Sequence, residues 1–269
     1  MPLLWLRVAM IFYAVGLAHA FFSLARRHEL LNRIVMPSIL LGALFHFVSL
    51  VELTVATGEL TPATVHHSES LLGFLVITFF LAFWLRYKTA SPGVFIFPLV
   101  FLLTLAASIG EQSPESSSPL LRTSWIFAHV TLTFLGYAAL LLSFVASLLY
   151  LVQERRLKSK SPKLWRMPAL EVLDEIGYKS LLAGFPLMTL GLVAGAVIAQ
   201  LQFGAAFFRD PKVALALLVW LVYLVLLFTR WSAGWRGRRA AVLATVAFVA
   251  AMTTWAANYF SVTHRYLGP

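Results

Sequence analysis

The stretch "WIFAHVTLTFLGYAALLLSFVASLLYLVQERRLK", residues 125–158, contains an apolar run long enough to cross a bilayer as one helix. About 20 consecutive apolar residues are needed for a helical membrane span. Similar runs recur along the whole chain, which has 269 residues, 60% of them hydrophobic and only 12% charged. In a typical soluble domain, about a quarter of the residues are charged. The sequence therefore predicts an all-α, polytopic integral membrane protein.

The apolar runs predict about eight transmembrane helices. The fifth is long enough to project beyond the membrane, and Pro92-Gly93 indicates a tight turn between the third and fourth. We expect two regions, an N-terminal four-helix membrane region over 1–123 and a second four-helix membrane domain over 124–269. The eight expected spans cover roughly 3–24, 34–55, 70–86, 93–110, 124–152, 179–202, 212–229 and 240–262.

The distribution of basic residues predicts the orientation of the chain. The loops after the first, third, fifth and seventh spans hold sixteen of the 21 Lys and Arg residues. Because basic loops stay in the cytoplasm, both termini are expected outside a multi-pass protein of the cell's inner (cytoplasmic) membrane. The same loops account for the net charge of +10 without a nucleic-acid partner, so membrane lipid is the expected surrounding. Loops 55–70, 110–124 and 203–211 then face outwards.

The longest polar segment, residues 153–178, lies on the predicted cytoplasmic side. Its part from 168 to 178 has apolar residues on one side of a helix and acidic residues on the other. This pattern predicts an amphipathic helix on the membrane surface.

Histidine is the main ligand chemistry that the sequence offers, because the chain contains no cysteine. His129, near the start of the fifth span, and His264, just beyond the eighth, are expected at the same outer depth. Two such imidazoles can supply both axial ligands of a haem iron, although interfacial histidines bonded to water or carbonyls are the alternative.

His46 lies near the middle of the bilayer, where an ionisable residue is costly and is a candidate for a second metal or haem site. A neutral imidazole bonded to a neighbouring helix is the alternative. The roles of His19, of His28 in a cytoplasmic loop, and of the outward pair His66-His67 stay open. No catalytic motif of a soluble enzyme is present, so we assign no catalytic residue and do not expect an enzyme acting by itself.

Three segments resemble one known family when they are taken in order. They are residues 125–158, residues 173–199 with "LDEIGYKSLLAGFPLMTLGLVAGAVIA", and residues 209–241 with "RDPKVALALLVWLVYLVLLFTRWSAGWRGRRAA", followed by Asn258 and His264. This part of the chain is similar to the cytochrome c assembly family, whose members include CcsA, ResC, CcmC and a HemX-like branch. The layout of the first four spans, with outside termini, resembles HemX-like members.

The resemblance implies a haem site at the outer membrane surface. In that family a loop of the form WGxxWxWDPKE holds haem between two flanking histidines, which would be His129 and His264 here. Aligned on Asp210-Pro211-Lys212, the family's tryptophans fall at Phe203, Phe207 and Arg209, so the motif is degenerate. Phenylalanine can stack on a porphyrin and arginine can pair with a propionate. Alternatively, the phenylalanines are an interfacial anchor and Asp210 simply caps the next helix.

Three functions follow from these observations. The first is handling of haem b, bound or delivered at the outer face for cytochrome c maturation, as part of a haem-lyase system whose partners bring the cysteines. The second, implied by the HemX-like branch, is a non-catalytic subunit or regulator of haem biosynthesis that no longer binds haem. The partners would be other proteins of cytochrome c biogenesis or haem biosynthesis. A small-molecule transporter is disfavoured, because intramembrane charges are few.

Overall fold

The computed structural model describes residues 2–25, 29–58, 62, 64–109, 124–159, 167–203 and 210–256. These residues form eight α-helices, the number that the sequence predicts. The helices are α1 (Pro2–Ala25), α2 (Glu29–Thr57), α3 (Val65–Tyr87), α4 (Gly93–Ile109), α5 (Ser124–Lys158), α6 (Leu170–Phe203), α7 (Pro211–Trp231) and α8 (Arg238–Ala256).

Six of these helices, α1, α2, α3, α5, α6 and α7, are long and apolar enough to cross a membrane. The apolar helix α4 is shorter, with 17 residues. The predicted fold class, an all-α polytopic membrane protein, is therefore confirmed, with six full-length spans found among the described residues. The expected eighth span ran from 240 to 262, and its end lies outside the part of the chain that the structure describes.

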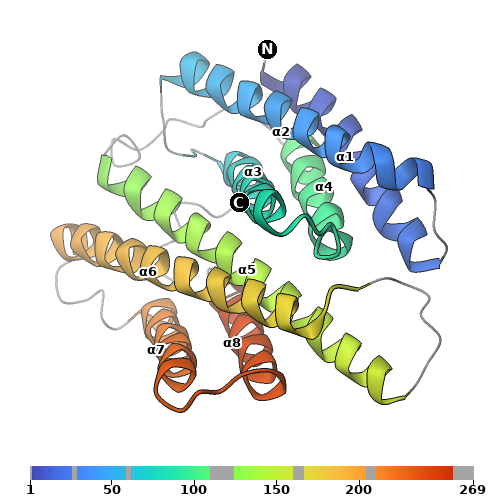
Figure 1. The fold of residues 1–269 in the computed structure, drawn as a ribbon. Coiled ribbons are helices and arrows are strands. Elements are labelled where there is room, and N and C mark those ends of the chain that lie inside the picture. The colour runs from blue at the N-terminus through green and yellow to red at the C-terminus, as the bar shows by residue number, and fades with distance from the viewer. Residues whose placement is uncertain are drawn as a thin grey trace. The chain divides into compact units, whose positions relative to one another are not determined.

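The chain divides into two compact units, residues 1–117 with 156–169 and residues 118–155 with 170–269. In the first unit, α1 lies beside α2 and α4, and α3 lies beside α4 (Figure 1). The side chains of Tyr13, Ile39, Phe80 and Phe97 are fully buried in its interior. Many other apolar side chains of these helices are exposed, as lipid-facing residues are.

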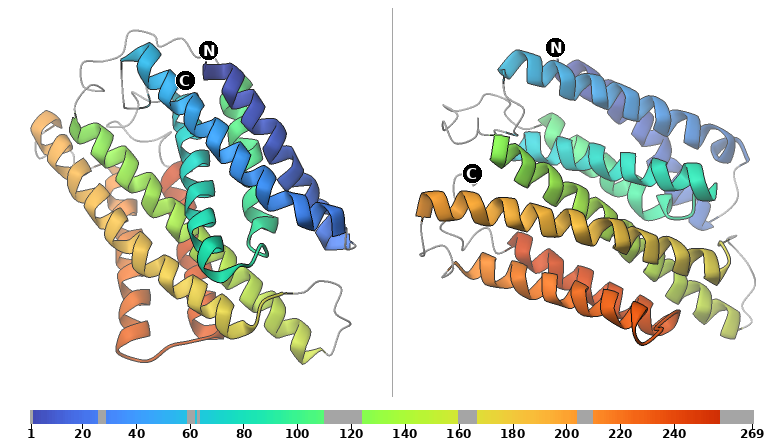
Figure 2. Two further views of the ribbon diagram at one scale, coloured as in Figure 1. Left: turned by 45° about the horizontal axis from the view of Figure 1, so that its top comes forward. Right: turned by 60° about the vertical axis from the view of Figure 1, so that its left-hand side comes forward.

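In the second unit, α5 and α6 lie side by side and run antiparallel (Figure 1 and Figure 2), and α7 packs against α8. A buried cluster that includes Leu140, Met188, Tyr223 and Phe248 joins all four helices. The amphipathic pattern is weak because both lipid and helix neighbours are apolar. Packing in this unit therefore depends on close fit between helices rather than on a polar outer face.

The turns between helices follow from their residues. Lys88 adopts a left-handed conformation with φ 52° at the end of α3, and the predicted Pro92-Gly93 turn leads into α4. Gly234 and Gly237 have φ of 62° and 64° in the turn between α7 and α8, a region that glycine occupies without a steric penalty.

The prediction of a separate surface helix over 168–178 is wrong. From Leu170 onward these residues are the first turns of α6, which continues without a break into the apolar span. Leu173 and Ile176 are fully buried in the second unit rather than facing lipid at the surface. The amphipathic pattern reflects packing against protein, because an apolar stripe on a helix does not distinguish a protein neighbour from lipid.

Candidate functional site

His129 lies in the second turn of α5 and is held by the neighbouring helix. Its ring atom Nδ1 is 2.7 Å from the backbone carbonyl oxygen of Gly191 in α6. A carbonyl oxygen can only accept a hydrogen bond, so Nδ1 carries the proton. The other ring nitrogen, Nε2, then has a free lone pair, which is the form in which a histidine coordinates a metal.

Asp210 caps α7, the helix that follows the loop predicted to face outwards. Its side-chain Oδ1 accepts a hydrogen bond of 2.8 Å from the backbone N–H of Lys212, and Pro211 occupies the first position of α7. The Asp210 side chain is buried, with 6% of the residue exposed. This is the structure that an Asp-Pro pair favours at a helix start. Asp210 therefore fixes where the loop ends and α7 begins.

Most other predicted residues of the outward site lie outside the described residues. Phe203 is the last residue of α6, and its side chain is among those not described. Phe207, Arg209 and His264 lie entirely outside the described residues.

His46 is fully buried in the first unit, and both of its ring nitrogens are within hydrogen-bond distance of a hydroxyl. Nδ1 is 3.4 Å from the Tyr13 hydroxyl, and Nε2 is 3.0 Å from Ser70 Oγ. The ring also makes an edge contact with Phe74. These contacts join α1, α2 and α3. In this arrangement neither nitrogen has a lone pair open to a metal, so His46 fits the alternative of a bonded neutral imidazole.

The remaining described histidines are each engaged differently. His19 Nε2 is 2.9 Å from Asn32 Oδ1, and Nδ1 of His66 is 3.1 Å from the carboxylate of Glu69. His67 is buried near the start of α3. Over the described ranges, no three or more His, Asp or Glu side chains come together in a way that would hold a metal ion. In His129 the Nδ1 atom is anchored on a backbone carbonyl, which leaves Nε2 as the ring nitrogen that can coordinate a metal.

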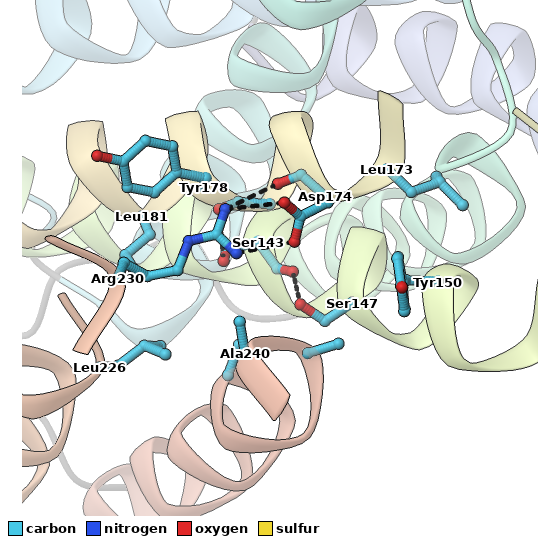
Figure 3. A pocket seen from close by; sticks show the side chains of 13 residues that line it. Ser143, Ser147, Tyr150, Leu173, Asp174, Tyr178, Leu181, Leu226, Arg230 and Ala240 are labelled. Carbon is cyan, nitrogen blue, oxygen red and sulfur yellow. Dashed lines mark hydrogen bonds and ion pairs between the residues drawn. The ribbon is translucent and has the colours of Figure 1, made fainter. Parts of the chain in front are cut away.

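A polar site that the sequence does not predict lies where α6 begins and α7 ends. Arg230 donates two hydrogen bonds to the Asp174 carboxylate, of 2.8 Å and 3.1 Å (Figure 3). The Cζ atom of its guanidinium lies over the Tyr178 ring, 4.6 Å from the ring centroid. The backbone N–H of Gly237 donates to the same carboxylate at 3.1 Å. Asp174 thus ties together α6, α7 and the turn that leads into α8.

A cavity of about 20 Å³ lies beside this ion pair, lined in part by Ser143, Ser147 and Tyr150 of α5 (Figure 3). This volume suits about one water molecule and no larger ligand. The arrangement is therefore a structural clamp. The sequence signal for this clamp is Asp174, directly after the buried Leu173, in the segment that the amphipathic pattern predicts at the membrane surface.

Helix number, length and apolar composition define the class as a polytopic all-α membrane protein. Comparison with known proteins identifies the family. A family model described as "Cytochrome C assembly protein" matches residues 4–263, so the chain belongs to this family, and its role lies in cytochrome c biogenesis. The match extends over the first four helices, beyond the part from 124 onward that carries the resemblance in the sequence.

Several proteins named "Cytochrome c biogenesis protein CcsA" are similar to this chain. The protein of Guillardia theta is 32% identical over 204 residues, which cover 67% of this chain and 68% of the relative. That of Heterosigma akashiwo (strain NIES-293 / 8280G21-1) is 30% identical over 219 residues, with the same coverage. That of Chlamydomonas reinhardtii is 33% identical over 161 residues, which cover 58% of this chain but 45% of the relative.

Proposed function

We propose that this chain binds haem b at the outer face of the cytoplasmic membrane and delivers it during cytochrome c maturation. The observation that carries the proposal is the state of His129. Its Nδ1 is fixed on the Gly191 carbonyl, which leaves Nε2 as the coordinating atom. A histidine held in this way is oriented before any iron arrives, so less freedom is lost when a ligand binds.

The other residues of the proposed site take their roles from the family resemblance. His264 would be the second histidine that holds the iron, Phe203 and Phe207 would contact the porphyrin, and Arg209 would pair with a propionate. Asp210 acts indirectly, because its side chain caps α7 and so fixes the end of the loop that presents these residues. Haem, when bound, supplies the iron and the vinyl groups that become attached to a cytochrome.

The chain acts with partners rather than alone. It contains no cysteine, so the thiols that accept haem must come from an apocytochrome. With both termini outside, as the basic loops predict, His129 lies at the outer surface, where such a partner would dock. Other cytochrome c biogenesis components would bring the apocytochrome that carries these thiols.

A visible absorption spectrum of the purified full-length protein, titrated with haem, tests this proposal. We expect stoichiometric binding with the six-coordinate spectrum of bis-histidine haem, and weaker or altered binding in His129→Ala and His264→Ala. His66→Ala is the matched control, because His66 is a half-exposed histidine bonded to Glu69. A wild-type protein that binds no haem, or a His129→Ala variant that binds it unchanged, contradicts the proposal.

A wild-type protein that binds no haem would favour the second candidate, a HemX-like subunit or regulator. One observation fits that role. Helix α5 continues beyond its apolar part to Lys158 and exposes basic side chains such as Arg155. If this end is a docking surface, neutralising Arg155, Arg156, Lys158 and Lys160 should remove a co-purifying partner. Retention of every partner after these changes contradicts the regulatory role.

A further inference from the structure

Glycines lie along the contact between α5 and α6, and the last contact in this series is between Gly195 and His129. Contacts run in antiparallel order, from Ala139 at Gly184 through Gly136 at Met188 and Thr133 at Gly191 to His129 at Gly195. The α6 positions 184, 188, 191 and 195 are spaced by four, three and four residues, so they lie along one face of the helix. Small residues along such a face let two membrane helices approach closely.

The closeness of approach differs along this face. A Cβ atom placed on Gly191 would lie 3.0 Å from the Thr133 backbone nitrogen and 2.5 Å from its Oγ1. A Cβ atom placed on Gly195 would lie 2.6 Å from both Cε1 and Nδ1 of the His129 ring. At Gly195 the obstacle is therefore the ring itself rather than the backbone of α5.

The ring cannot move away from Gly195 without a loss. Its Nδ1 is already held at 2.7 Å by the carbonyl oxygen of Gly191, one helical turn earlier on the same helix. A methyl group at position 195 would displace the ring edge that carries this hydrogen bond. The absence of a side chain at 195 and the carbonyl at 191 thus define one position for the imidazole.

We infer that Gly195 is a positioning residue for His129. Together with the Gly191 carbonyl it holds the ring in the Nδ1-protonated form, with Nε2 as the coordinating atom. The coordinating role of that atom rests on the proposed function, whereas the contact between Gly195 and the ring does not. Partners that orient a metal-binding histidine typically contribute about 10- to 100-fold to the affinity for the metal.

A double-mutant cycle on the purified, haem-free full chain tests the contact. Gly195→Ala should lower the thermal midpoint in the wild-type background. In the His129→Ala background, where the obstructing ring is absent, the same change should be neutral or raise the midpoint, because alanine favours a helix over glycine. Gly177→Ala is the matched control, since a Cβ atom there meets its nearest neighbours at 3.6 to 3.8 Å, which is ordinary contact.

Haem titration of the same variants tests the positioning. We expect Gly195→Ala to weaken haem binding about 10- to 100-fold and Gly177→Ala to leave it unchanged. If Gly195→Ala alone fails to fold but folds when combined with His129→Ala, the contact is supported. An equal effect of Gly195→Ala in both backgrounds overturns the inference, as does wild-type haem affinity in that variant. A wild-type chain that binds no haem refutes the proposed function and the coordinating role, while the cycle still decides the contact.

Discussion

Replacing Asp174 by alanine should be among the most destabilising single changes in the second unit. The change removes both hydrogen bonds to Arg230 and the bond from the Gly237 N–H. The Arg230 side chain is only 7% exposed and would keep its charge without this partner, while the Asp174 side chain is 21% exposed. Breaking a buried ion pair on one side costs about 3 to 5 kcal/mol, and we expect the lower end because Asp174 is partly exposed.

The adjacent residue provides the matched control. Glu175 pairs with Lys179 on the exposed side of α6, and their side chains are 41% and 46% exposed. An exposed pair of this kind contributes about 0 to 1 kcal/mol, so Glu175→Gln should change stability little. The two acidic residues are neighbours in sequence and differ mainly in burial and in the partners that they hold.

Thermal unfolding of the purified protein in one detergent, with helicity as the signal, measures the difference between these variants. A double variant, Asp174→Ala with Arg230→Met, should recover part of the loss because no buried charge is left. It should not recover the bond from the Gly237 N–H, which has no acceptor without Asp174. Equal midpoints for Asp174→Ala and Glu175→Gln would refute the assignment of Asp174 as a buried clamp.

Three further changes test other parts of the structure. His46→Ala should lower the stability in thermal unfolding by on the order of 3 kcal/mol, because it empties a fully buried site. It should leave haem affinity unchanged, and lost haem binding in a folded variant would contradict this. Asp210→Ala should lower the stability by about 1 kcal/mol, because it removes the cap of α7. Asp210→Ser should keep most of the wild-type stability, because serine can also cap a helix. Equal stability of the alanine and serine variants would argue against capping. Gly136→Ala should cost about 1 to 3 kcal/mol, because its Cβ would lie 2.9 Å from the Met188 backbone nitrogen, and a midpoint equal to that of Gly177→Ala would contradict the close approach.

The helices could be predicted from the sequence because each reflects a local property. Apolar runs near 20 residues and the Pro92-Gly93 turn are readable without any knowledge of packing. The start of α6 at Leu170 was missed for a physical reason. Its first turns carry apolar residues on one side and acidic residues on the other. A helix that lies on a membrane surface has the same amphipathic pattern, so the sequence does not distinguish the two.

The candidate site was only partly predictable. The position of His129 near one end of its span followed from counting residues, and its selection as a ligand rested on the family resemblance. The hydrogen bond to Gly191 joins residues 62 positions apart, and that from Arg230 to Asp174 joins residues 56 apart. Such pairs depend on how two helices are aligned, which hydrophobic periodicity does not specify. Glycines at 177, 184 and 191, seven residues apart on α6, were the available signal for that alignment.

In the proposed function, His129 coordinates haem iron through Nε2. Electron paramagnetic resonance of the ferric, haem-loaded full-length protein examines this coordination at the iron itself, because the signal reports the axial ligands. We expect a low-spin bis-histidine signal in the wild type that is lost in His129→Ala and retained in His66→Ala. A His129→Ala protein with the same bis-histidine signal and the same haem content as the wild type would contradict the account.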